Sequence, residues 1–89
     1  MGKLNTTNHQ YSTTDTALAS YMVIKGFVIT LIDYSLPRFE FRFVGDTEKL
    51  QEHAQKYLTG KALVDPATFT RVNRKLMRLV KNQLQWGDG

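Results

Sequence analysis

The 89-residue sequence contains no cysteine, so it can form neither a disulfide framework nor a thiolate zinc site. No apolar run reaches the roughly 18 residues that a membrane-spanning helix requires, and the first ten residues are too polar for a signal peptide. Histidine is scarce as well: His9 and His53 are the only two, and neither has carboxylates at metal-ligand spacing. We therefore expect a cytoplasmic protein with no bound metal and no membrane partner.

Motifs that support catalysis are equally scarce. Ser12, Ser20 and Ser35 lack the Gly-x-Ser-x-Gly context of an activated nucleophile. Neither a Gly-rich phosphate loop nor a dinucleotide fingerprint occurs. Asp33 and Glu40 flank a predicted turn, but one carboxylate pair is a weak basis for acid–base chemistry. The sequence predicts a protein that is not an enzyme and uses no cofactor.

The chain is long enough for one domain with one hydrophobic core. Residues 1–11 are rich in Asn, Thr, Gln and Gly, so we interpret them as a flexible polar arm. Residues 12–86 form the predicted domain, and residues 87–89 form a short tail. Trp86 closes the domain, and it is predicted either to anchor on the core or to contact a partner.

Two segments have the composition of strands. Residues 27–34 are mostly β-branched or aromatic, and residues 38–43 alternate between aromatic and charged. Pro37 bars a helix between them. Because neighbouring side chains of a strand point to opposite faces, the alternation predicts an antiparallel hairpin with one aromatic face (Phe39, Phe41 and Phe43) and one charged face (Arg38, Glu40 and Arg42).

Helix signals flank this hairpin. Ser12 and Asp15 have the spacing of a capping box, which predicts a first helix that ends at Gly26. Asp46 is placed to cap a second helix, and Asp65 with Pro66 to begin a third that runs to about Leu84. The predicted order is therefore α-β-β-α-α, an α+β domain in which one hairpin packs against three helices.

A two-stranded sheet is marginal alone and exposes two edges. We expect the hairpin to pair with a second copy, giving a homodimer with a four-stranded sheet. The alternative is a monomer in which the N-terminal arm or the helices cover an edge.

Four segments carry a resemblance to a known family: TALASY (16–21), KGF (25–27), PRFEF (37–41) and YLTGKALVDP (57–66). Over residues 13–82 the chain resembles a family of short bacterial and phage domains of unknown function. The shared residues are cap, turn and core residues, so the resemblance implies a fold and brings no catalytic or binding residue. It implies a phage or mobile-element setting, with the host cytoplasm as location.

The charge of the chain is concentrated in its last third. Residues 1–60 hold six basic and six acidic residues, whereas residues 61–89 hold six basic and two acidic, so the whole net charge of +4 arises there. At 100° per residue, five bases of the third helix fall within about 120° of arc, opposite an apolar arc. These five are Arg71, Arg74, Lys75, Arg78 and Lys81.

This all-basic arc predicts contacts with the phosphates of DNA or RNA. Other interpretations stay open: a solvated helix surface, or an acidic protein partner. A lipid surface is disfavoured because the core needs the apolar arc. A helix-turn-helix, with Arg71 and Arg74 reading bases, is disfavoured by the long link between the second and third helices and by Asn73, which falls on the apolar arc. The alternative function is a protein-interaction module, phage-encoded, that acts through the hairpin edge or Trp86.

Overall fold

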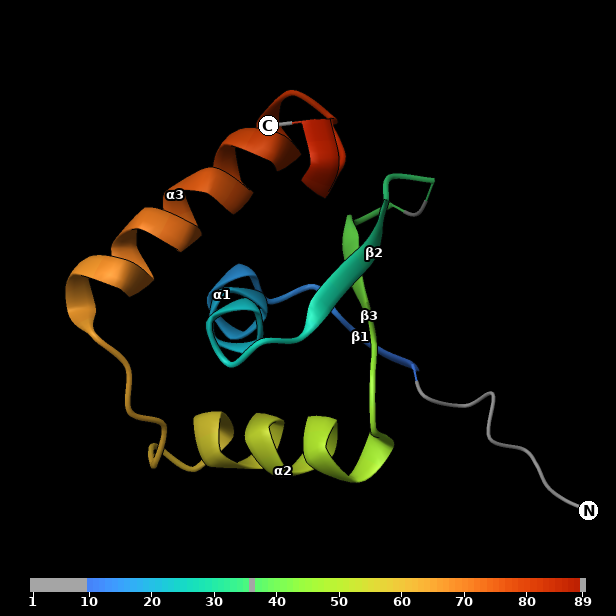
Figure 1. Ribbon diagram of the computed structural model, residues 1–89. Helices are drawn as coiled ribbons and strands as arrows, with labels where there is room; N and C mark the ends of the chain where they lie inside the picture. Colours follow the sequence, from blue (N-terminus) through green and yellow to red (C-terminus); the bar gives the residue numbers. More distant parts are fainter. Residues whose placement is uncertain (1–9, 36, 89) are drawn as a thin grey trace, which may run out of the picture.

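A computed structural model describes residues 10–35 and 37–88 of the chain (Figure 1). The predicted helix and strand order is confirmed, with one strand added before it. In chain order the elements are β1 (Gln10–Thr13), α1 (Thr16–Ile24), β2 (Val28–Asp33), β3 (Glu40–Val44), α2 (Thr47–Leu58), α3 (Pro66–Lys81) and a short 3-10 helix, η2 (Trp86–Asp88).

The predicted hairpin is formed by β2 and β3, which pair antiparallel from Val28 opposite Val44 to Asp33 opposite Glu40. A β-bulge between Ile29 and Leu31 interrupts the register. The predicted division of faces holds, because Phe41 and Phe43 are fully buried while the intervening positions of β3 reach solvent.

Strand β1 was not predicted as a strand, although the alternative to the dimer had the N-terminal arm covering an edge of the hairpin. It corrects the interpretation of the arm as flexible. Gln10 pairs with Val44 and Thr13 with Phe41, so the sheet has the order β1-β3-β2 with β3 in the centre. The arm prediction for residues 1–11 is therefore wrong at residues 10 and 11, while residues 1–9 lie outside the described part. The pairing satisfies backbone groups along the edge of β3 that would otherwise need water. It also covers one of the two edges at which a dimer was predicted.

An aspartate is the N-cap of each of the three α-helices, and two of these caps, Asp46 and Asp65, were predicted. Asp46 accepts hydrogen bonds from the first turn of α2, and Asp65 from Thr68 of α3. The capping box proposed at Ser12 is wrong: Ser12 lies in β1, and Asp15 is itself the N-cap of α1. Each such cap stabilises its helix by about 1 kcal/mol.

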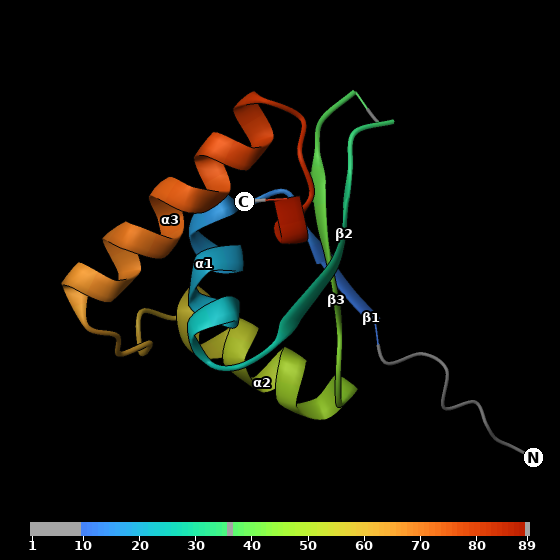
Figure 2. The same cartoon turned by 45° about the horizontal axis from the view of Figure 1, so that its top comes forward.

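The helices lie on one side of the sheet in two layers (Figures 1 and 2). Helix α1 lies between the sheet and α3, and α2 crosses beneath α1 near the start of the sheet. The opposite face of the sheet carries no helix among the described residues. Between these layers lies the core, whose largest fully buried side chains are Tyr21, Phe41, Phe43, Met22, Ile32, Leu50, Leu76 and Leu79.

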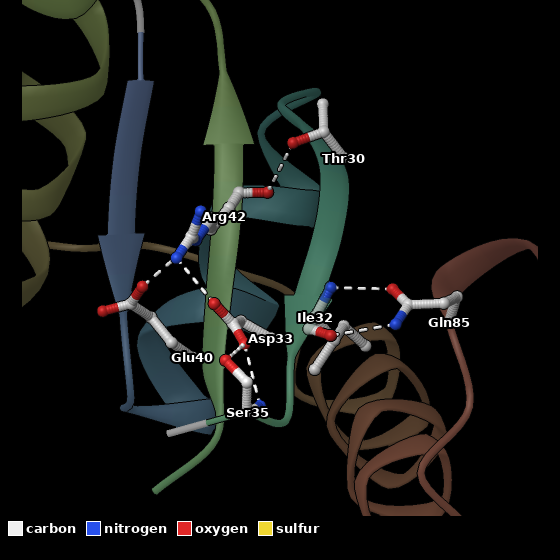
Figure 3. Close-up of polar contacts among 7 residues, drawn as sticks. All are labelled: Thr30, Ile32, Asp33, Ser35, Glu40, Arg42 and Gln85. Carbon is white, nitrogen blue, oxygen red and sulfur yellow. Dashed lines mark hydrogen bonds and ion pairs between the residues drawn. The ribbon is translucent and has the colours of Figure 1, made fainter.

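The chain after α3 turns back onto the sheet. Helix α3 ends at Lys81, three residues earlier than predicted, and Gln83 takes a left-handed backbone with φ 53°. The amide of Gln85 then bonds both backbone groups of Ile32: its Oε1 accepts from Ile32 N–H at 2.7 Å, and its Nε2 donates to the Ile32 carbonyl at 2.9 Å (Figure 3). This side chain therefore takes the place of a neighbouring strand on the outer edge of β2 at Ile32.

We predict that Gln85→Ala lowers the free energy of unfolding by about 1–3 kcal/mol, because it leaves two backbone groups of β2 without their partner. The measurement is chemical denaturation followed by circular dichroism. Gln51→Ala, at an exposed position of α2, is the control and should change stability by less than about 0.5 kcal/mol. Equal stability of the two variants would contradict the assigned role of Gln85.

Candidate nucleic-acid interface

The exposed side of α3 carries four basic side chains in one line: Arg71, Arg74, Arg78 and Lys81. We call these four residues the basic row. Their spacing of i, i+3, i+7 and i+10 places them within about 80° of the helix circumference and along about 15 Å of its axis. All four are exposed. Four of the five predicted bases therefore lie exposed along one side of α3.

The helix is held in this rotation by its opposite side. Leu76 and Leu79 of α3 are fully buried, and Phe69 and Val80 pack against the same core. Asn73 was predicted to point away from solvent, and its Oδ1 accepts a hydrogen bond from Ser20 of α1 at 3.1 Å. Asn73 thus joins two helices of the protein and is poorly placed to read a base.

The basic row takes no part in the ion pairs found among the described residues. Within residues 10–35 and 37–88, no Asp or Glu forms an ion pair with any of the four; the ion pairs there involve Arg42 and Lys56. Asp65 is the acidic residue at the start of the same helix, and its carboxylate accepts hydrogen bonds from Thr68. Hydrogen bonds from the backbone and side chain of Thr68 hold the pKa of Asp65 below its ordinary value, and the charge of Arg71 adds to this effect.

Lys75 differs from the other four predicted bases. Its side chain is partly buried, and its Nζ lies 4.2 Å from the centre of the Trp86 ring. A cation at this distance over a tryptophan face is attracted by about 0.5–1 kcal/mol or more. Lys75 therefore contributes to the attachment of the C-terminal segment, and the basic row keeps only residues whose charge faces solvent.

An open hollow runs along the first three turns of α3. Two of its lining residues, Ala67 and Thr70, are small, so an anionic group can approach the neighbouring guanidinium groups without steric hindrance. The full lining is Ala67, Thr70, Arg71, Arg74, Lys75 and Arg78. Arginine suits phosphate especially well because its planar group donates two parallel hydrogen bonds.

Trp86 is folded back rather than free. It lies in η2, is partly buried and packs against the core beneath Lys75. Tyr34 closes the same corner, since its hydroxyl donates to the carbonyl of Leu84 at 2.6 Å. Of the two predictions for Trp86, the structure therefore supports the anchor. The predicted tail at 87–89 is also shorter than expected, because Gly87 and Asp88 belong to η2.

The helix-turn-helix alternative gains nothing from the geometry. Seven residues separate Leu58 at the end of α2 from Pro66 at the start of α3, against the usual three or four. Helix α3 packs chiefly on α1, and α2 lies apart from it (Figure 2).

The uncovered face of the sheet is a second candidate surface. Arg42 forms ion pairs there with Asp33 at 2.6 Å and Glu40 at 3.2 Å (Figure 3). The predicted carboxylate pair is thus bridged by a guanidinium group. Hydrogen bonds from Ser35 lower the pKa of Asp33, and Arg42 lowers it further. Such a neutralised cluster is less suited to an anionic ligand than the basic row.

Apolar side chains accompany this cluster. Val28, Leu31 and Val44 are 60%, 40% and 45% exposed. An antiparallel sheet commonly leaves one face to water, and some apolar side chains on such a face are normal. This face therefore points less clearly to a ligand than α3 does.

His53 lies on the side of α2 that faces Tyr21 and Phe27. Its Nδ1 lies 3.3 Å from the Tyr21 hydroxyl, and its ring meets the edge of Phe27. Burial lowers the pKa of His53, and the charge of Lys56 lowers it further. No cluster of three metal-ligating side chains exists in the described part of the chain. His9 lies outside that part.

Comparisons of the chain with protein-family models, with curated proteins and with solved structures found no match. No helix of the described residues has the length and hydropathy needed to cross a membrane.

We predict that acidification destabilises the protein through His53. Because its pKa in the folded protein is below the ordinary value of 6.5, the unfolded chain binds more protons at mildly acidic pH, and stability falls as the pH drops below about 6.5. The measurement is the denaturation midpoint between about pH 7.5 and 5.5 in the wild type and in His53→Gln. The variant should lose part of this pH dependence, whatever its stability at neutral pH. An unchanged slope would contradict the assignment.

Proposed function

We propose that this protein is a small binding domain that contacts nucleic acid through the basic row of α3. The observation that carries the proposal is the line of four exposed bases with no carboxylate paired to them among the described residues. Phosphate contacts of this kind position a protein on nucleic acid without reading sequence. The proposal therefore concerns sequence-independent binding.

A lipid surface fits less well. Amphipathic helices that bind membranes place their apolar side among the lipid chains. In α3 that side carries Leu76 and Leu79, both fully buried in the core. Binding lipid with this side would require both leucines to leave the core. That would cost more free energy than a weak lipid interaction provides, since removing one buried leucine side chain costs about 2–5 kcal/mol.

The alternative proposal is a protein-interaction module, in a phage or mobile-element setting. Trp86 and the edges of the hairpin were its expected surfaces. Trp86 is partly buried beneath Lys75, β1 covers the free edge of β3, and Gln85 bonds the outer edge of β2 at Ile32. The homodimer remains a prediction, and it would need the outer edge of β1, the rest of the β2 edge or the uncovered sheet face.

The proposal predicts a steep salt dependence. With four phosphate contacts, affinity for labelled oligonucleotides should fall by about 10²-fold between about 50 and 200 mM salt. Fluorescence anisotropy measures this directly. Arg74→Gln/Arg78→Gln should reduce the slope of log affinity against log salt by about two, because two contacts are lost.

The matched control is Arg38→Gln/Lys49→Gln, which removes the same charge from exposed positions outside α3. It should leave the slope nearly unchanged. If both double variants weaken binding equally, the effect is one of net charge and the basic row is not the interface. If an acidic protein binds but no oligonucleotide does at low salt, the nucleic-acid proposal is wrong.

A further inference from the structure

The aromatic residues of this protein bear on the kind of nucleic acid it binds. The sequence has four Tyr, five Phe and one Trp, and all of them fall within the described residues. None is exposed. Proteins that bind single strands combine a basic groove with exposed aromatic rings on which bases stack, each worth about 1–3 kcal/mol. This protein offers basic side chains to hold phosphates, whereas its aromatic rings are buried or only partly exposed.

The two aromatic residues nearest in sequence to the basic row are occupied within the fold. Phe69 of α3 packs against the core. Trp86 is partly buried, with Lys75 Nζ 4.2 Å above its ring. Exposing either ring would require part of the core or the C-terminal segment to detach. An unpaired base therefore gains little from this surface.

The spacing within the basic row suits a duplex. Arg71 and Arg74 form one pair, and Arg78 and Lys81 form a second pair seven residues further along α3. Seven residues correspond to about 10.5 Å of helix axis. The major groove of B-form DNA is about 12 Å wide, so two pairs at this separation can each reach the phosphates on one side of it.

The place of α3 in the fold leaves this contact unobstructed. Helix α3 is the layer furthest from the sheet, with α1 behind it (Figure 2). The exposed residues beside the first pair, Ala67 and Thr70, are small. The basic side chains can therefore reach the phosphates of a duplex without steric hindrance from the rest of the protein. The major groove of duplex RNA is deep and narrow, so it fits this arrangement less well.

We propose that the basic row selects double-stranded DNA over single strands by contacting phosphates on both sides of one groove. This inference rests on the proposed function. It adds to it the class of nucleic acid and a division of the row into two pairs that act together.

The test uses the full chain and three labelled probes: a DNA duplex of about 15 base pairs, or one and a half turns, its separate strand, and an RNA duplex of the same length. Anisotropy titrations over a range of salt should give a slope of about −3.6 for duplex DNA and about −1.4 for a single strand held by one pair. Duplex DNA should bind at least about tenfold more tightly than the single strand at the same low salt.

Two double variants test the division into pairs: Arg71→Gln/Arg74→Gln and Arg78→Gln/Lys81→Gln. Each should reduce duplex affinity to about that of the single strand, with little effect on the single strand itself, because bridging needs both pairs. Circular dichroism confirms that each variant is folded.

The outcomes separate this inference from the proposed function. If the protein binds single strands, or duplex RNA, as tightly as duplex DNA, the choice of duplex DNA is wrong while nucleic-acid binding stands. If each double variant weakens duplex and single strand equally, the bridging arrangement is wrong. If no probe binds at low salt, the proposed function itself fails.

Discussion

The burial of Leu76 and Leu79 decides how the last long helix can be used. Both side chains are fully buried in the core. Replacing such a leucine by alanine costs about 2–5 kcal/mol, a large part of the stability of a domain this size. Because successive side chains advance by 100° around a helix, fixing these two leucines inward also fixes Arg71, Arg74 and Arg78 outward. The proposed binding surface is therefore a consequence of core packing.

The segment after α3 links the C-terminal end of the helix to the sheet. Gln85 bonds both backbone groups of Ile32, Tyr34 bonds the carbonyl of Leu84, and Lys75 lies over Trp86. These contacts connect the C-terminal end of α3 to β2, although α1 lies between α3 and the sheet (Figure 2). A surface held in this way loses little conformational entropy when a ligand binds, apart from that of its long side chains.

Much of this architecture could be predicted from local patterns. The alternation of Phe41 and Phe43 with charged residues indicated the hairpin, and Asp46 and Asp65 with Pro66 indicated two helix starts. These signals work because they depend on neighbouring residues alone. The basic row was also predictable, since a helix of known start converts spacing into angle.

The features that were missed depend on partners distant in sequence. Strand β1 has no alternating apolar pattern, and it forms because β3 offers an unpaired edge. Gln85 reaches Ile32 across 53 residues, a contact with no local signal. The same holds for the pairing of Lys75 with Trp86, which leaves one of the five predicted bases only partly exposed. The predicted sheet was thus one strand too small.

The central claim is that nucleic acid binds to α3 and to no other face. The most direct measurement is a map of backbone amide chemical shifts in ¹⁵N-labelled protein during titration with a DNA duplex. The account predicts shift changes concentrated on residues 67–81, with the uncovered face of the sheet unaffected. Changes centred on Val28, Leu31 and Val44, with α3 unchanged, would contradict it.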